Sequence, residues 1–181
     1  MPSVLVILHP GVEEMEATAP IDLLRRAEVK VTTAAPGTTR LITGKTGIGL
    51  QADTLLDHLS EELFDAVVIP GGPGIKALRH HQGVRDLVNR HWEADKWVAA
   101  ICAGPLVLLD AGILTDQAFT SHASTQEELP ARRADERVVE DGRLITSQGA
   151  GTATDFGLTL IERLVDADTR KAVADSIAWS V

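Results

Sequence analysis

The sequence contains a single cysteine, and it lacks both a long apolar run and an excess of positive charge. With one cysteine the chain cannot form an internal disulfide, which fits a protein of the reducing cytosol. No apolar run approaches the roughly 20 residues that a membrane-spanning helix needs. The first apolar run, residues 4–8, is too short for a secretory signal core and has no basic leader. We therefore expect a soluble, cytoplasmic protein.

The formal net charge of −9 at pH 7 bears on which partners the protein can bind. It argues against a general nucleic-acid surface and against attraction to anionic membranes, because those partners are themselves negative. Hydrophobic residues make up 44% of the chain and charged residues 24%, which is ordinary for a globular protein. A length of 181 residues can bury a sizeable core, so we predict one domain over residues 1–181.

Apolar β-branched runs alternate along the chain with segments of helical periodicity. The main predicted strands are residues 3–9, 29–35, 65–70 and 97–101, and the main predicted helices are residues 13–27, 75–95, 105–112, 152–165 and 169–179. Such alternation, with strands apolar on both faces, is typical of an α/β three-layer sandwich around a mostly parallel sheet. In these folds sites form where strands end.

Smaller elements are also predicted. Two short hairpins should cover residues 41–52 and 137–147, a short helix residues 54–63, and a short strand residues 118–121. Pro20 should kink or restart the first helix, and the long one should break near Gly83.

Cys102 stands where a predicted strand turns into a predicted helix, within the sequence Ala-Ile-Cys-Ala-Gly-Pro. A nucleophile on such a tight turn is lifted above the sheet and lies beside the first N–H groups of the helix, as in a nucleophile elbow. The positive helix end should lower the thiol pKa. The alternative is that Cys102 is merely a small buried hydrophobic residue.

Two other strand ends supply candidate partners. The Gly71-Gly72 turn and Ala103 offer backbone N–H groups for an oxyanion, and Glu16 follows the first strand. Each also has a plain structural interpretation, the glycines as a tight turn and Glu16 as a surface carboxylate at a helix start. The sequence gives His9, His58 and His91 no evident partners, and it shows no cluster of metal ligands.

Four blocks, in order along nearly the whole chain, resemble the ThiJ/PfpI superfamily. They are Gly-Val-Glu-Glu-Met-Glu at residues 11–16, the strand and Pro-Gly-Gly ending at 65–72, Ala-Ala-Ile-Cys-Ala-Gly-Pro at 99–105, and Thr-Ser-Gln-Gly-Ala-Gly-Thr at 146–152. The branch they resemble contains the Parkinson-disease-associated protein deglycase and its bacterial relatives. The chain departs from that branch at Ala123 and Ala150, where many relatives have proline.

The resemblance implies a flavodoxin-like fold, a homodimer and a reactive, oxidisable cysteine at Cys102. It implies that Glu16 hydrogen-bonds the sulfur and that Gly72 and Ala103 provide oxyanion-hole amides. It further implies that His122 lies near the thiol and that Asp22 of a partner subunit approaches that histidine.

The activity that the resemblance implies is that of a cofactor-independent glyoxalase or protein deglycase, acting on methylglyoxal, glyoxal or their adducts. The Cys102 thiolate would attack the aldehyde carbon, and Glu16, assisted by His122, would move the proton. We expect Cys102 and Glu16 to share one proton, which is held on Glu16. The alternative is an oxidative-stress sensor or redox-regulated chaperone that uses the same cysteine.

Overall fold

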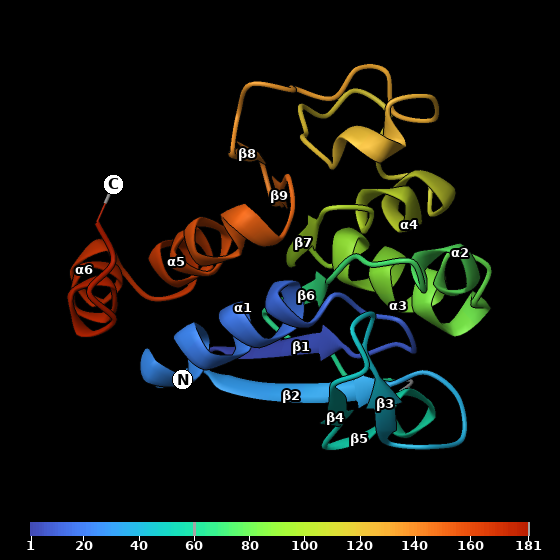
Figure 1. The fold of residues 1–181 in the computed structure, drawn as a ribbon, viewed down its shortest axis with the longest axis horizontal. Helices are drawn as coiled ribbons and strands as arrows, with labels where there is room; N and C mark the ends of the chain where they lie inside the picture. Colours follow the sequence, from blue (N-terminus) through green and yellow to red (C-terminus); the bar gives the residue numbers. More distant parts are fainter. Residues whose placement is uncertain (60, 181) are drawn as a thin grey trace.

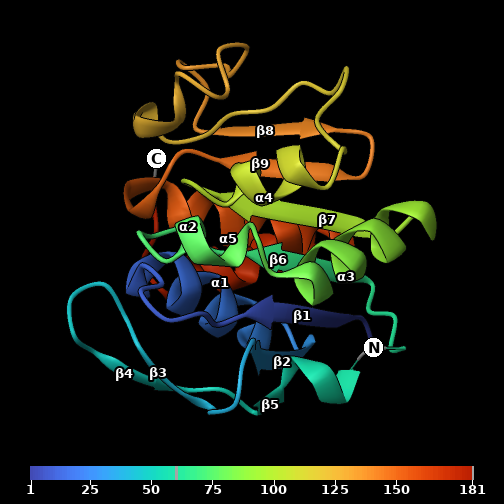
Figure 2. The same ribbon diagram turned by 90° about the vertical axis from the view of Figure 1, so that its right-hand side faces the viewer.

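The near-continuous apolar runs form one seven-stranded sheet in the computed structural model, which describes residues 1–59 and 61–180 (Figure 1 and Figure 2). The strand order is β5-β2-β1-β6-β7-β9-β8, and every neighbouring pair is parallel except β8 with β9. The strands are β1 (Ser3–Ile7), β2 (Lys30–Ala35), β5 (Thr54–Leu55), β6 (Ala66–Ile69), β7 (Trp97–Ile101), β8 (Val138–Asp141) and β9 (Leu144–Ser147).

Alternate side chains of each central strand enter two separate cores. Along β1, Val4 and Val6 belong to one core and Leu5 and Ile7 to the other, and all four are fully buried. This is why these strands are apolar on both faces. One core lies under helices α1 (Glu14–Arg26), α5 (Ala153–Leu164) and α6 (Ala167–Ser176); the other lies under α2 (Ile75–Leu78), α3 (Gln82–Glu93) and α4 (Pro105–Asp110).

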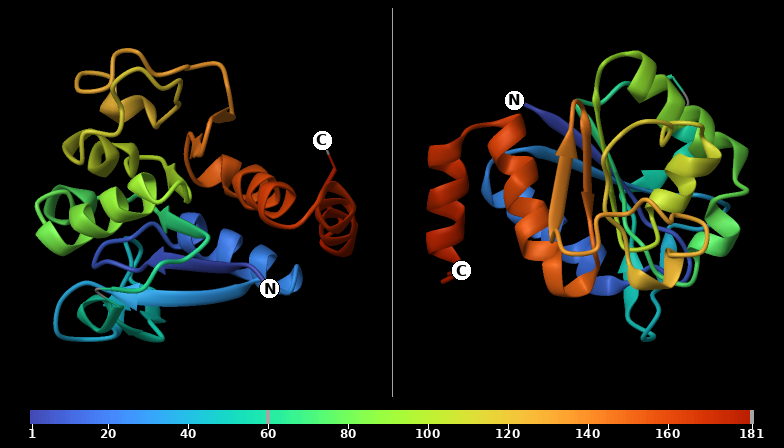
Figure 3. Two further views of the ribbon diagram at one scale, coloured as in Figure 1. Left: turned by 180° about the vertical axis from the view of Figure 1, so that it is seen from behind. Right: turned by 90° about the horizontal axis from the view of Figure 1, so that it is seen from above.

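Figure 3 shows the resulting layers, with α5 and α6 on one side of the sheet and α2, α3 and α4 on the other. The predicted α/β, flavodoxin-like three-layer sandwich is confirmed. Both predicted hairpins form as well. One is β3 (Leu41–Thr43) with β4 (Gly49–Gln51), which stand apart from the main sheet, and the other is β8 with β9.

The helix predicted over residues 54–63 does not form in its described part, residues 54–59 and 61–63, and residue 60 lies outside the described residues. Instead β5 pairs with β2, so that Thr54 lies opposite Ala34, and the 3-10 helix η1 (Leu56–Leu59) follows. The reason lies next to β5, where the Asp53 carboxylate accepts hydrogen bonds from the N–H and hydroxyl groups of Thr33, both at 2.8 Å. These bonds hold the chain at the sheet edge before any helix can begin.

Three smaller expectations differ in detail from the structure. Residues 118–121 form no strand, because the N–H of Thr120 donates to the Thr146 hydroxyl rather than to a backbone carbonyl. The long helix does break near Gly83, at residues 79–81, where the backbone of His81 is extended, and Gly83 itself lies inside α3. Helix α1 continues through Pro20 without restarting.

The carboxyl ends of β1, β6, β7 and β9 meet at one edge of the sheet because these strands are parallel neighbours. The segments that follow them carry Glu16, Gly71, Cys102 and Gly149. At this edge the fold brings together residues that are far apart in the sequence. None of the helices in the described part of the chain is long and apolar enough to cross a membrane.

Candidate active site

Glu16 is buried in the first turn of α1, with 1% of its surface exposed. Its backbone N–H donates to the Glu13 carboxylate at 2.9 Å, so Glu13 caps the helix. Its own carboxylate accepts a hydrogen bond from the Gly71 N–H at 2.9 Å and another from the Cys102 thiol. The interpretation of Glu16 as a surface carboxylate is therefore wrong.

Cys102 occupies the turn between β7 and α4 and has a φ of +64°. This left-handed conformation costs a non-glycine residue about 1–3 kcal/mol. Two backbone bonds of 2.9 Å hold it, from the Cys102 N–H to the Ser147 carbonyl and from the His122 N–H to the Cys102 carbonyl. The side chain is partly buried, and its sulfur accepts hydrogen bonds from the N–H groups of Gly72 and Ala103.

Gly71 allows these groups to approach one another. A Cβ atom at this position would lie 2.7 Å from the Cys102 Cβ, 2.7 Å from the Glu16 Oε2 and 2.8 Å from the Ala103 nitrogen. No side chain fits there. Its N–H is occupied by Glu16, so Gly71 positions the carboxylate and only Gly72 and Ala103 face the sulfur. Of the three predicted oxyanion donors, Gly71 therefore holds Glu16, and Gly72 and Ala103 are the two that remain for an oxyanion.

The carboxyl and thiol groups perturb each other. Burial raises the pKa of Glu16 to about 7, although the hydrogen bond from Cys102 acts against the rise. Burial, followed by the charge of Glu16 and the hydrogen bond to it, raises the pKa of the Cys102 thiol to about 12. The amides of Gly72 and Ala103 lower the thiol pKa, but they do not outweigh a carboxylate in contact with the sulfur.

The two shifts therefore belong to one coupled pair rather than to either group alone. Over a wide pH range this pair holds one proton, and the prediction that the proton resides on Glu16, beside a thiolate of lowered pKa at Cys102, stays a prediction. Wherever the proton rests, Glu16 is in hydrogen-bond contact with the nucleophile and can accept or return its proton. This is the arrangement of a general base and a nucleophile.

His122 lies beside this pair without a hydrogen bond to the thiol or to Glu16 in the described residues. Its Nδ1 accepts from the Ser124 N–H at 3.2 Å and lies 2.9 Å from the Ser124 hydroxyl. A Cβ at Gly149 would lie 3.4 Å from the His122 Cδ2 and 3.7 Å from the Glu16 Oε1, so both side chains flank Gly149.

Asp22 lies outside the site in this chain. Its carboxylate is 60% exposed and pairs with Arg26 at 2.7 Å one helical turn later. The predicted approach of Asp22 to the histidine of a partner subunit stays a prediction.

A cavity of about 610 Å³ opens over the pair, which is a volume typical of ligand pockets. It is lined by residues predicted from the sequence, namely Cys102, Glu16, His122, Gly72 and Ala103. Three cationic side chains that no sequence motif marks also line it: Lys45, Lys76 and Arg79. Arg79 is neutralised by Asp110 at 2.6 Å and Glu128 at 2.7 Å. Lys45 comes from the β3–β4 hairpin, which lies next to the site only in the folded chain.

His9 is a second residue whose surroundings the sequence did not reveal. It is 1% exposed, and its two ring nitrogens lie 3.2 Å from the carbonyl oxygens of Pro10 and Pro70. No signal in the sequence could have identified these partners, because backbone carbonyls carry no residue signature.

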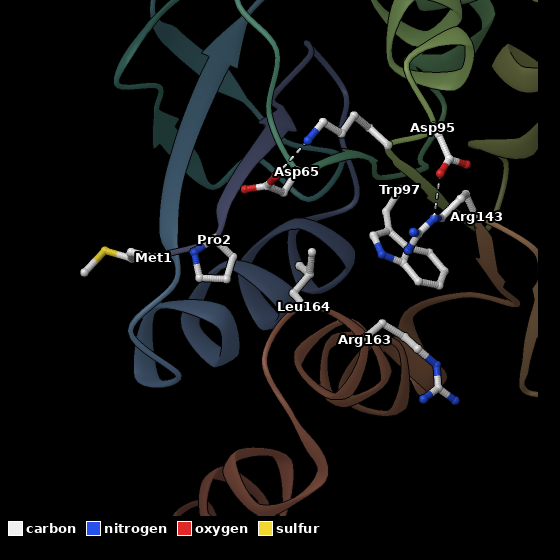
Figure 4. Close-up of a pocket in the computed structure, with 9 residues that line it drawn as sticks. Met1, Pro2, Asp65, Asp95, Trp97, Arg143, Arg163 and Leu164 are labelled. Atoms are coloured by element: carbon white, nitrogen blue, oxygen red, sulfur yellow. Dashed lines mark hydrogen bonds and ion pairs between the residues drawn. The ribbon is translucent and has the colours of Figure 1, made fainter.

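A smaller cavity of about 420 Å³ lies among the amino ends of β1 and β7 and the end of α5 (Figure 4). Its cations are matched by acids, since Lys96 pairs with Asp65 at 3.0 Å and Arg143 with Asp95 at 3.7 Å. No lining residue is a nucleophile beside a base, so the chemistry belongs to the larger cavity. Across the described residues no group of three His, Cys, Asp or Glu side chains could hold a metal ion.

Known proteins of similar sequence and structure identify the family of the chain. The model of the DJ-1/PfpI family matches residues 2–163. The chain belongs to the DJ-1/PfpI family. The resemblance found in the four sequence blocks is thereby confirmed.

The sequence is 38% identical to Protein DJ-1alpha of Drosophila melanogaster, over 97% of this chain and 83% of that protein. It is 33% identical to Glutathione-independent glyoxalase DJR-1.2 of Caenorhabditis elegans, over 90% of this chain and 88% of that protein. The crystal structure of Drosophila melanogaster DJ-1beta, 36% identical, covers 99% of both chains with a TM-score of 0.96. A DJ-1-type function follows from these matches.

Proposed function

We propose that this protein is a cofactor-independent glyoxalase of the glyoxalase III type, which converts methylglyoxal to lactate and glyoxal to glycolate. The observation that carries the proposal is the contact between the Cys102 thiol and the buried Glu16 carboxylate inside a ligand-sized cavity. The name of the Caenorhabditis elegans relative, a glutathione-independent glyoxalase, supports the same class of reaction.

The first step is addition of the thiol to the aldehyde. Glu16 takes the thiol proton as the sulfur attacks the aldehyde carbon and then gives that proton to the carbonyl oxygen, which leaves a hemithioacetal and a free Glu16 carboxylate. The Gly72 and Ala103 N–H groups, which hydrogen-bond the resting sulfur, stabilise the negative charge that develops on that oxygen.

The second step moves hydrogen between the two carbons of the dicarbonyl. Glu16 removes the hydrogen from the former aldehyde carbon as a proton, and the adjacent ketone carbon receives a proton, with His122 assisting. One carbon is oxidised to a thioester while its neighbour is reduced to an alcohol, so no external oxidant is needed. Water then cleaves the thioester, which releases lactate and regenerates the thiol.

The test measures lactate formation from methylglyoxal by nuclear magnetic resonance, with wild-type protein treated with a chelator and with the Cys102→Ser variant. Wild-type protein should form lactate, and the variant should lose turnover by about two to four orders of magnitude while keeping its circular dichroism spectrum. Lactate formation by Cys102→Ser at the wild-type rate would refute the proposal. In an assay on glycated peptide, a chemical scavenger of free glyoxal serves as the comparison. Loss of the adduct faster than the scavenger alone achieves indicates direct deglycase action, and loss at the same rate indicates removal of the free aldehyde only.

The second candidate function is that of an oxidative-stress sensor or a redox-regulated chaperone, both of which would use oxidation of Cys102. It is favoured by the position of the partly buried sulfur between two N–H groups, which could hold the oxygens of a sulfinate. Burial of the sulfur opposes it, because burial disfavours the thiolate, which is the form that oxidises. Intact mass after mild peroxide decides: rapid addition of about two oxygens at Cys102 supports a sensor, and an unmodified Cys102 excludes it.

We further propose that the protein acts as a homodimer in the cytoplasm. Three large apolar side chains at the start of α1 and on the β3–β4 hairpin are more than half exposed: Met15 at 58%, Leu41 at 63% and Ile48 at 55%. The hairpin is fixed to the helix start, because the Glu14 carboxylate accepts hydrogen bonds of 2.7 Å from the N–H and hydroxyl groups of Thr46. A second copy would bury these side chains.

A further inference from the structure

His9 follows β1 and contacts the loops on which the candidate site is built. Its Nδ1 lies 3.2 Å from the Pro10 carbonyl and its Nε2 3.2 Å from the Pro70 carbonyl. The ring is confined, since a Cβ at Gly74 would lie 2.6 Å from its Nδ1. The imidazole is therefore fixed between the loop after β1 and the loop after β6.

The Pro70 carbonyl that faces His9 belongs to the same peptide unit as the Gly71 N–H that faces Glu16. A peptide unit is planar, and in the trans form its C=O and N–H point in opposite directions. No cis bond occurs in the described residues. His9 and Glu16 thus lie at the two ends of one rigid group, at 3.2 Å from its oxygen and 2.9 Å from its nitrogen.

We propose that His9 is a positioning residue that holds and tunes Glu16 through the Pro70–Gly71 peptide. The Nε2–H of His9 donates to the Pro70 carbonyl and fixes the peptide plane. Donation to the C=O also polarises the peptide, which strengthens the Gly71 N–H as a donor to the Glu16 carboxylate. The proposal rests on the function of Glu16 as the base in the proposed reaction.

The proton of the neutral ring is assigned to Nε2 on geometric grounds. A neutral imidazole has one N–H, whereas the carbonyls of Pro70, Pro10 and Gly71 all face the ring. The Gly71 carbonyl already accepts from the Glu13 N–H at 3.0 Å, so the choice lies between Pro70 and Pro10. The contact of Nε2 with Pro70 is fully buried, whereas that of Nδ1 with Pro10 is only partly buried. A buried carbonyl without a donor is the costlier of the two. Burial lowers the pKa of His9, which keeps the ring neutral near pH 7.

The experiment compares His9→Phe, which keeps a ring but loses the donor, with His9→Gln, whose amide can donate from the position of Nε2. The readout is the titration of Glu16, followed by nuclear magnetic resonance of carboxyl carbons. In His9→Phe the pKa of Glu16 should rise above its value of about 7. A rise of one pH unit reduces the carboxylate, and hence turnover, about tenfold at pH 6 and leaves turnover at pH 9 unchanged. His9→Gln should restore the wild-type titration.

His91 provides a matched control, because it is also a buried histidine with both ring nitrogens engaged. Its Nε2 accepts from the Phe64 N–H at 3.0 Å and its Nδ1 lies 2.7 Å from the Leu87 carbonyl, in α3 and away from the site. His91→Phe should lower stability and leave the Glu16 titration unchanged. A wild-type Glu16 titration in His9→Phe, or the same shift in His9→Gln as in His9→Phe, would overturn the proposal.

A measurement on the wild-type protein keeps the test independent of folding in the variants. Nitrogen-15 chemical shifts of the His9 ring report which nitrogen carries the proton, and we expect Nε2. A ring protonated only at Nδ1 overturns the proposal. Because neither this measurement nor the Glu16 titration requires glyoxal turnover, failure of the proposed reaction and failure of the proposed function of His9 give different results.

Discussion

Replacing Glu16 by Gln tests where the shared proton resides. The thiol pKa of about 12 is raised by burial and, next in size, by the charge of Glu16. Glutamine keeps the shape and removes the charge. A like charge in contact shifts a pKa by about one to three pH units, so the thiol pKa should fall to between about 9 and 11. At pH 8 the thiolate fraction would then increase about 10- to 1,000-fold, while glyoxal turnover falls for lack of a base.

The assay is the ultraviolet absorbance of the thiolate, followed from pH 7 to pH 11. The sequence contains no tyrosine, so no tyrosinate absorbance overlaps the signal, and Cys102 is the chain's only thiol. If the resting pair were instead a thiolate beside a neutral acid, Glu16→Gln would remove a strong donor and the thiol pKa would rise. A rise would therefore refute a resting proton on Cys102, and unchanged turnover would refute Glu16 as the base.

Three further predictions follow from named contacts. Because the pKa of Glu16 is raised from 4.5 to about 7, the wild-type fold loses stability as the pH rises through this range. In urea unfolding at pH 8, Glu16→Gln should therefore be about 3 kcal/mol more stable than wild type, and the difference should vanish near pH 4.5. Gly71→Ala should abolish turnover, since its Cβ would lie 2.7 Å from the Glu16 Oε2, whereas Gly151→Ala, with nothing within 4 Å of the added Cβ, should retain it. In sedimentation, wild type should be a dimer at micromolar concentration and Ile48→Glu a monomer, with Leu63→Glu, an equally apolar exposed position, as the control.

Much of the fold follows from local patterns in the sequence. The strands at residues 66–69 and 97–101 match the prediction because both faces of each are buried, which demands an unbroken apolar run. The two-residue strand at Thr54 could not be predicted. It depends on Asp53 binding Thr33, a contact between residues 20 positions apart that no local preference encodes.

The site was predictable where it depends on strand ends and not where it depends on their surroundings. That Glu16, Gly72 and Cys102 meet follows from parallel strands whose carboxyl ends share an edge. That Cys102 and Glu16 would share one proton was predictable from their expected contact, whereas the burial that raises the pKa of both groups depends on the packing of several strands and helices. His9 was missed because its Pro70 partner lies 61 residues away and contributes only a backbone oxygen.

The chemistry of this site is set largely by backbone atoms. The groups that contact the reacting pair are the N–H groups of Gly71, Gly72 and Ala103, and they stay in place only while the peptide path after β6 and β7 is held. Side-chain truncation cannot remove such donors. The residues that can be exchanged are those that fix the path or change the local charge, such as His9 and Lys45, whose charge lowers the pKa of Glu16. Activity at neutral pH should therefore respond most to substitutions outside the reacting pair that move the Glu16 titration across pH 7.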